Sequence, residues 1–136
     1  MKSKVEYKDG MHFIGDLDGL KIPVDAKKEF GGQNKGPLPK GLVLTALAGC
    51  TAMDVIGMLE KMRIELESFT VEAEGELAKE HPKVFTKILI TYTLKGDDIP
   101  YEKVEKAVNL SQDMYCGVSA MLKKITQIDH RIIIKA

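Results

Sequence analysis

Apolar and polar positions alternate with a period of two along the first 25 residues. The segments KVEYKD, MHFIGDLDG and LKIPVDA show this alternation, and the dipeptides Asp9-Gly10 and Asp18-Gly19 separate them. Alternation of this kind is typical of half-buried strands, and Asp-Gly is a strong hairpin signal. The pattern therefore predicts a three-stranded antiparallel meander over residues 4–25.

A loop and then a long apolar helix are predicted next. Residues 27–41, KKEFGGQNKGPLPKG, contain four glycines and two prolines, which indicates a loop. Residues 42–63 form one helical stretch whose first half is apolar on nearly every side. A helix of that kind is normally buried all round. We therefore expect a central helix whose N-terminal half is covered by sheet or by a partner subunit.

The second half of the chain returns to strands before it becomes helical again. Period-two alternation over 65–78 and 83–96 predicts a long hairpin, with Ile88, Ile90, Tyr92 and Leu94 on one face of its second strand. Helical spacing then indicates a helix over 99–115, a shorter helix over 117–125, and a final strand over 127–136. The helices are clustered and there is no βαβ repeat, which is typical of an α+β protein. A single domain over 1–136 is expected.

Composition and charge indicate which kinds of molecule the protein is not expected to bind. The chain is 44% hydrophobic and 29% charged, and its 20 basic residues balance its 20 Asp and Glu. A net charge of zero disfavours a nucleic acid or an anionic membrane as a partner. The N-terminus MKSKVEYKDG has no apolar signal core, and no run is expected to be long enough to span a bilayer. The expectation is a cytoplasmic protein that binds neither nucleic acid nor membrane.

Only two cysteines occur, Cys50 in ALAGCTAM and Cys116 in YCGVSAML. Two cysteines cannot make a disulfide scaffold of the secreted kind. Together with the three histidines they lack any zinc-type spacing, so a metal site would have to be assembled from distant parts of the chain. No metal and no cofactor are therefore expected.

The local sequence leaves the role of the cysteines open. Free cysteine is often buried as a small hydrophobe, so Cys50 could be core filler. Gly49 and the nearby alanines would instead let a ligand or another backbone come close. Cys116 is expected between two helices, where a helix N-terminus favours the thiolate. Asp54, one helical turn after Cys50, would disfavour a thiolate that it faced, and we expect it to point elsewhere.

Three motifs follow one another along the chain, namely FGGQNKGPLPKGLVLTALAGCTAMDV, HPKVFTKILITYTLKG and YCGVSAML. They resemble, in this order, the loop and first-cysteine helix, the P-x-x-F-x-x-I strand and the second-cysteine segment of the OsmC/Ohr family of osmotically induced and organic-hydroperoxide-resistance proteins. The similarity covers nearly the whole chain. It implies an OsmC-like α+β fold, with antiparallel sheets around a long central helix in an intertwined homodimer.

The resemblance also implies a chemistry in which Cys50 is the peroxidatic thiol and Cys116 the resolving thiol. A thiolate attacks the O–O bond of an organic hydroperoxide, becomes a sulfenic acid, and condenses with the second thiol to a disulfide. The implied partners are a second copy of the chain, a small hydrophobic peroxide or other apolar ligand, and a thiol or dithiol reductant. The alternatives are a non-catalytic small-molecule or fatty-acyl binding protein on the same scaffold, and a structural dimer with core cysteines.

The chain departs from the family at the groups that activate the first cysteine. Better-characterised members use an Arg in the N-terminal region and a Glu just after the loop proline. Here no arginine precedes Arg63, and Lys40 follows Pro39. Lys lacks the fixed fork geometry of Arg. We therefore expect Cys50 to attack peroxide more slowly than in relatives that carry the Arg.

Overall fold

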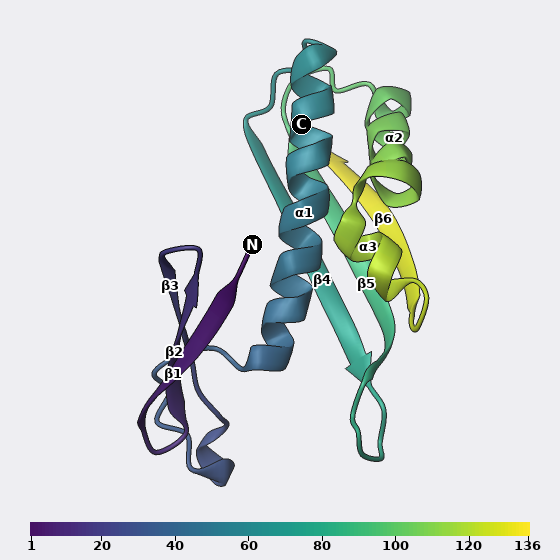
Figure 1. The fold of residues 1–136 in the computed structure, drawn as a ribbon. Helices are drawn as coiled ribbons and strands as arrows, with labels where there is room; N and C mark the ends of the chain where they lie inside the picture. Colours follow the sequence, from purple (N-terminus) through teal and green to yellow (C-terminus); the bar gives the residue numbers. More distant parts are fainter. The chain divides into compact units, whose positions relative to one another are not determined.

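Two three-stranded sheets and three α-helices make up the structure, a computed structural model that describes residues 1–136 (Figure 1). The chain divides into a first unit, Met1–Val43, and a second unit, Leu44–Ala136. Each unit contains one of the sheets. The single domain over 1–136 stays a prediction.

The first unit carries the meander that the alternation predicted. Its strands pair antiparallel in the order β1-β2-β3, with bounds Ser3–Asp9, His12–Leu17 and Leu20–Val24. The turn residues Gly10, Asp18 and Gly19 have φ values of 51°, 48° and 92°. Such positive φ values match the right-handed twist of the flanking strands, so the Asp-Gly dipeptides do place the turns.

The predicted loop is organised around one buried carboxylate. The Asp25 side chain accepts hydrogen bonds from the backbone N–H groups of Ala26, Gln33 and Lys35, at 2.8, 2.9 and 3.2 Å. The Gln33 N–H, with those of Lys35 and Ala26, holds the pKa of Asp25 below its usual value. A Cβ at Gly32 would lie 2.5 Å from the Ala26 carbonyl carbon, so the chain approaches itself too closely there for any side chain. Within the loop a short 3₁₀ turn, η1, covers Lys28–Phe30.

The long helix α1 runs from Pro39 to Lys61. It begins three residues earlier than the predicted start at 42 and ends two residues before the predicted end at 63. Proline is well suited to the first helical position, where its missing N–H is not needed. Arg63 has a φ of 59°, a left-handed conformation just beyond the end of the helix.

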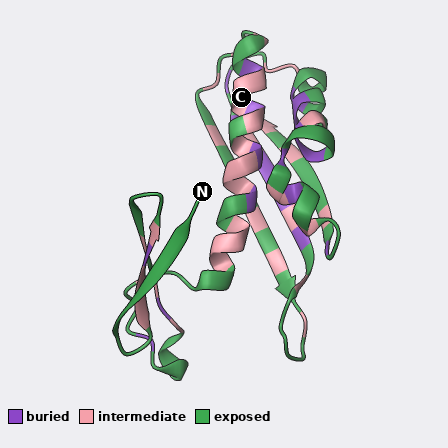
Figure 2. Cartoon of the chain, viewed as in Figure 1, coloured by how far each residue is buried: buried purple, intermediate pink, exposed green.

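Only one stripe of α1 is buried within the chain. Its fully buried residues are spaced four apart, at Leu47, Thr51, Val55 and Leu59. The rest of the helix is partly or fully exposed (Figure 2), and Met53 keeps 75% of its surface. The expected cover of the N-terminal half of α1 by a sheet is therefore incomplete within this chain. Cover by a partner subunit stays a prediction.

By length and composition α1 could also span a membrane, so the expectation that no run reaches that length is wrong. Its mean hydropathy over the most apolar 18 residues is 1.9, and 22% of that window is buried. A core helix of a soluble protein passes the same test, and one such helix is weak support for a membrane span. The same exposure is expected of a helix that packs against a second subunit.

The sheet of the second unit is mixed rather than antiparallel. Its strands are β4 (Ser68–Leu77), β5 (Phe85–Lys95) and β6 (Gln127–Lys135), in the order β4-β5-β6. β4 pairs antiparallel with β5, as the hairpin pattern predicted, but β6 pairs parallel to β5. The expectation of antiparallel sheets is wrong for this pair. Parallel neighbours need a long crossover, and the helices between β5 and β6 supply it.

The crossover contains three helical pieces. α2 covers Tyr101–Leu110, a π-helical segment η2 covers Ser111–Tyr115, and α3 covers Gly117–Leu122. The predicted helix over 99–115 is thus an α-helix that changes to a π-helix at residue 111. Figure 1 shows α1, α2 and α3 on one face of the second sheet.

The core lies between this sheet and the helices. The β5 residues expected to share one face are all fully buried, namely Ile88, Ile90, Tyr92 and Leu94. They pack in one cluster with the buried stripe of α1 and with Val104, Ala107 and Val108 of α2. Tyr92 is the one residue of this β5 face with a polar group, and it marks the region where the cysteines lie.

Candidate functional site

The fold brings the two cysteines together. Cys50 lies in α1, and Cys116 lies between η2 and α3, 116 − 50 = 66 positions later. Their sulfur atoms and a carboxylate oxygen of Asp54 all lie within 4.8 Å of one another. Both cysteines are free thiols. A disulfide between them would require only a small movement, since the S–S bond is about 2.05 Å long.

The π-helical segment η2 positions Cys116. The Cys116 N–H donates to the Ser111 carbonyl oxygen at 2.8 Å, a hydrogen bond that spans five residues. This wider turn ends the helix and leaves Cys116 in an extended conformation, with φ −73° and ψ 101°. π-Helical turns are rare and often occur at functional sites. The pattern of apolar residues does not distinguish this turn from an α-helix, so the predicted helix over 99–115 did not include a π turn.

The two thiols differ in exposure. Cys50 is partly exposed, whereas Cys116 keeps 2% of its surface. Cys116 caps α3, and its sulfur accepts a hydrogen bond from the Ser119 N–H at 3.3 Å. Cys50 is thus the thiol that a solute can reach, and Cys116 is the sheltered one.

Burial raises the pKa of the Cys116 thiol to about 11. The Ser119 N–H opposes this shift, while a hydrogen bond with the Cys50 thiol and the charges of Cys50 and Asp54 add to it. The balance is the opposite of the expectation that a helix N-terminus would favour the Cys116 thiolate. Burial outweighs the single N–H contact, so Cys116 is a neutral thiol at pH 7.

Asp54 faces the thiols, and the expectation that it points elsewhere is wrong. Its carboxylate oxygen Oδ2 accepts a hydrogen bond from the Ser111 hydroxyl at 2.9 Å. Ser111 belongs to η2 and Asp54 to α1, so this hydrogen bond joins the two helices beside the thiols. Asp54 forms no ion pair, and the ion pairs of the second unit lie at exposed positions, Lys95–Glu67 and Lys123–Asp113. No ion pair therefore supplies a cation at the Asp54 carboxylate.

A buried polar network continues from Asp54 into the core. Thr51 Oγ1 lies 2.7 Å from both Tyr92 OH and Ser111 Oγ. Gln112 Nε2 donates to Tyr92 OH at 3.0 Å and to Thr51 Oγ1 at 3.2 Å, and Ser119 Oγ donates to Gln112 Oε1 at 2.7 Å. The side chains of this network are 0 to 6% exposed. Because buried polar groups are costly when unpaired, a fully paired network fixes the relative position of α1, β5 and η2.

The buried polar network was not predicted, although the positions of two of its residues in the sequence pattern indicated buried hydroxyl groups. Thr51 lies on the apolar stripe of α1, and Tyr92 lies on the buried face of β5. A hydroxyl at a position that periodicity assigns to the core must find a partner there. Burial also raises the pKa of Tyr92, so its hydroxyl remains protonated at neutral pH.

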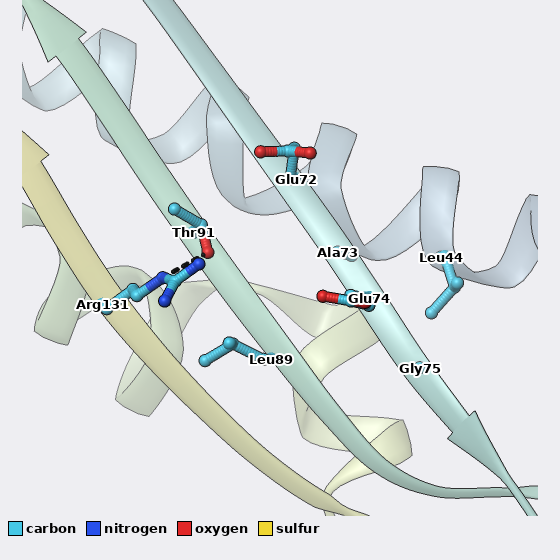
Figure 3. Close-up of a pocket in the computed structure, with 8 residues that line it drawn as sticks. All are labelled: Leu44, Glu72, Ala73, Glu74, Gly75, Leu89, Thr91 and Arg131. Atoms are coloured by element: carbon cyan, nitrogen blue, oxygen red, sulfur yellow. Dashed lines mark hydrogen bonds between the residues drawn. The ribbon is translucent and has the colours of Figure 1, made fainter.

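A cavity of about 530 Å³ in the second unit is separate from this site. Its lining includes Glu72 and Glu74 of β4, Thr91 of β5 and Arg131 of β6, and neither cysteine. Figure 3 shows Arg131 reaching from β6 to Thr91, whose hydroxyl accepts from the guanidinium Nε at 2.9 Å. The lining also includes Leu44, Ala73, Gly75 and Leu89, so charged and apolar residues both face this cavity.

A known protein family matches the part of the chain that contains the thiol site. The family model for OsmC-like protein matches residues 32–131, which include both cysteines, Asp54 and the whole network. The chain belongs to the OsmC-like family. Protein YhfA of Escherichia coli is 34% identical over 131 residues, covering 96% of this chain and 95% of YhfA.

Solved structures confirm the OsmC-like α+β fold. A hypothetical protein from Aquifex aeolicus superposes with a TM-score of 0.86 at 27% identity, covering 98% of this chain and 94% of that one. An organic hydroperoxide resistance protein OsmC from Legionella pneumophila has a TM-score of 0.69 at 18% identity, with coverages of 99% and 96%. The Legionella protein, at that identity, shares the fold with this OsmC-like chain.

Proposed function

We propose that this OsmC-like protein is a thiol-dependent peroxidase that reduces organic hydroperoxides with Cys50 and Cys116. The observation that carries the proposal is the convergence of the only two thiols within 4.8 Å. Family membership supports it, because the Legionella protein of the same fold is an organic hydroperoxide resistance protein.

The two thiols have different roles in the proposed cycle. The Cys50 thiolate attacks one oxygen of the hydroperoxide, an S–O bond forms, and the O–O bond breaks. The alkoxide leaves as an alcohol after it takes up a proton, and Cys50 becomes a sulfenic acid. Cys116 then attacks the Cys50 sulfur, the S–S bond forms, and the hydroxyl leaves as water. A thiol or dithiol reductant returns both residues to thiols.

The environments of the thiols support this division. Cys50 is partly exposed and can meet a substrate, whereas burial and a raised pKa keep Cys116 protonated and out of competition for peroxide. Cys116 must lose its proton when it attacks. The Asp54 carboxylate, within 4.8 Å of that sulfur, can take it up directly or through water.

Apolar side chains beside the cysteines support an organic substrate. Met53 follows Cys50 by three residues and is 75% exposed. Met114 and Tyr115 directly precede Cys116 and are 70% and 59% exposed. Exposed apolar groups of this kind favour an alkyl or aryl hydroperoxide over hydrogen peroxide. We further propose a cytoplasmic homodimer, because both thiols are free and most residues of α1 keep part of their surface exposed.

Thiol counting and intact mass test the proposal. The reduced protein is treated with an aryl hydroperoxide or with hydrogen peroxide. The organic substrate should consume two thiols per chain and form one intrachain disulfide, and it should react faster than hydrogen peroxide. Cys116→Ser should react once and stop at a sulfenic acid that a carbon nucleophile traps. Cys50→Ser should not react at an appreciable rate.

Two results would contradict the proposal. One is a wild-type protein whose thiols both remain free after exposure to hydroperoxide. The other is a Cys50→Ser protein that reacts as fast as the wild type. In either case, extraction of the purified protein and mass analysis of any bound small molecule or fatty-acyl chain would test the non-catalytic alternative.

A further inference from the structure

Three groups that can each carry a negative charge meet at the thiol pair without a cation. The Cys50 and Cys116 sulfurs and an Asp54 oxygen lie within 4.8 Å of one another, and Asp54 has no ion pair. Cysteine sulfur and carboxylate oxygen are both common metal ligands, so three such groups at this spacing form a candidate metal site.

The spacing of the three atoms fits a metal ion. Zinc binds thiolate sulfur at about 2.3 Å and carboxylate oxygen at about 2.0–2.2 Å, which places tetrahedral donors roughly 3.5–3.8 Å apart. The observed atoms lie within 4.8 Å of one another. Side-chain movements of about 1 Å therefore bring them to coordination distance. No hydrogen bond joins Asp54 to either sulfur, so among the three donors metal binding replaces only the hydrogen bond between the two thiols.

Neighbouring groups already orient two of the three donors. Ser111 donates to Asp54 Oδ2 at 2.9 Å, which leaves Oδ1 available. The Ser119 N–H donates to the Cys116 sulfur at 3.3 Å. Ser111 is itself held by Thr51 at 2.7 Å. Groups that orient metal ligands through hydrogen bonds commonly raise metal affinity by about 10–100-fold.

We propose that Cys50, Asp54 and Cys116 form a binding site for Zn²⁺, with a fourth position open to water. Two sulfur donors select zinc over magnesium and calcium, which require oxygen donors. The metal replaces the thiol protons and holds both sulfurs as thiolates in its coordination sphere. Because its sulfurs are then occupied, the zinc form cannot close the disulfide. That consequence rests on the proposed peroxidase function, whereas zinc binding itself does not.

Zinc competition with a chromophoric chelator tests the site on the full, reduced protein. The wild type should bind one zinc per chain, and zinc should protect both thiols from alkylation. Asp54→Asn should bind zinc at least about tenfold more weakly, and Ser111→Ala about 10–100-fold more weakly. Asp113→Asn is the matched control, because this exposed η2 carboxylate contacts Lys123 and not the thiols. Its affinity should equal that of the wild type.

The disulfide form and cobalt provide independent measurements. Protein whose thiols have been joined by a chemical oxidant should lose the high-affinity site. Cobalt bound to the reduced protein should show the sulfur-to-metal charge-transfer band that thiolate ligation produces. Equal zinc affinity in the reduced, oxidised and Asp54→Asn proteins would overturn the proposal, as would cobalt without a thiolate band. A protein that binds zinc but consumes no hydroperoxide would leave the metal site standing and refute the peroxidase.

Discussion

Removal of one hydroxyl, in Thr51→Val, should destabilise the protein well beyond the loss of an average hydrogen bond. Thr51 is fully buried, and its Oγ1 contacts Tyr92 OH, Ser111 Oγ and Gln112 Nε2. Valine has nearly the same shape, so the substitution leaves no large cavity. The effect therefore measures the polar network rather than the packing.

The direction of each hydrogen bond follows from the number of available protons. Ser111 has one hydroxyl proton and donates it to Asp54, so Thr51 must donate to Ser111. Thr51 then has no proton left for Tyr92, and Tyr92 must donate to Thr51. Valine at position 51 would leave the buried Tyr92 O–H without an acceptor.

The magnitude of the Thr51→Val effect follows from this assignment. An unsatisfied buried donor costs about 1–3 kcal/mol, and the other lost hydrogen bonds add about 0.5–1.5 kcal/mol each. With one stranded donor and two other lost hydrogen bonds, we expect the free energy of unfolding to fall by about 2–6 kcal/mol. Tyr92→Phe removes the stranded proton together with its oxygen, so it should cost only about 1–2 kcal/mol. The double variant should be no less stable than Thr51→Val alone.

Urea unfolding at one fixed protein concentration measures these differences, because an oligomer's stability depends on concentration. Thr91→Val is the matched control. Thr91 is 7% exposed, and its hydroxyl accepts one hydrogen bond, from the Arg131 Nε, so removal of that hydroxyl should cost about 0.5–1.5 kcal/mol. Strictly additive effects of Thr51→Val and Tyr92→Phe would refute the assigned direction of the hydrogen bonds. An effect of Thr51→Val no larger than that of Thr91→Val would refute the importance of the network.

Three further predictions concern pH, packing and assembly. Burial raises the pKa of Cys116 from 9.0 to about 11, so between these pH values the folded state holds a proton that the unfolded state has lost. The free energy of unfolding should therefore fall as the pH rises from about 9 to about 11, and it should fall less in Cys116→Ser. Gly75→Ala should destabilise by about 1–3 kcal/mol in urea unfolding, because the new Cβ would meet the Phe85 ring, whereas Gly49→Ala meets nothing within 4 Å and should not destabilise this chain. The exposed apolar surface of α1 predicts a dimer in sedimentation at low micromolar concentration, and a folded monomer there would contradict it.

Local patterns were sufficient where neighbours along the chain determine the structure. Asp9-Gly10 and Asp18-Gly19 place the turns of the meander, because a short-range preference for positive φ decides them. The alternation over β4 and β5 predicted both the hairpin and the buried face of β5. The three motifs that resemble the OsmC/Ohr family also depend only on residues close in sequence, and the family is confirmed.

The parallel pairing of β6 and the π-helical turn of η2 were beyond such patterns. A final apolar strand has the same alternation whether it joins a sheet parallel or antiparallel. The crossover through α2, η2 and α3 decides its direction. The π turn depends on one hydrogen bond, from the Cys116 N–H to the Ser111 carbonyl, and a hydrogen bond between backbone groups does not show in the pattern of side chains.

The sequence by itself determined the elements, the family and the identity of the two thiols. Only the tertiary structure decided that Cys50 and Cys116 meet across 66 positions, that Asp54 turns towards them, and that burial keeps Cys116 protonated. The physical reason is that a thiol's environment depends on which elements pack around it. Periodicity assigns a residue to one side of its own helix or strand, but packing decides which side chains of other elements it meets there.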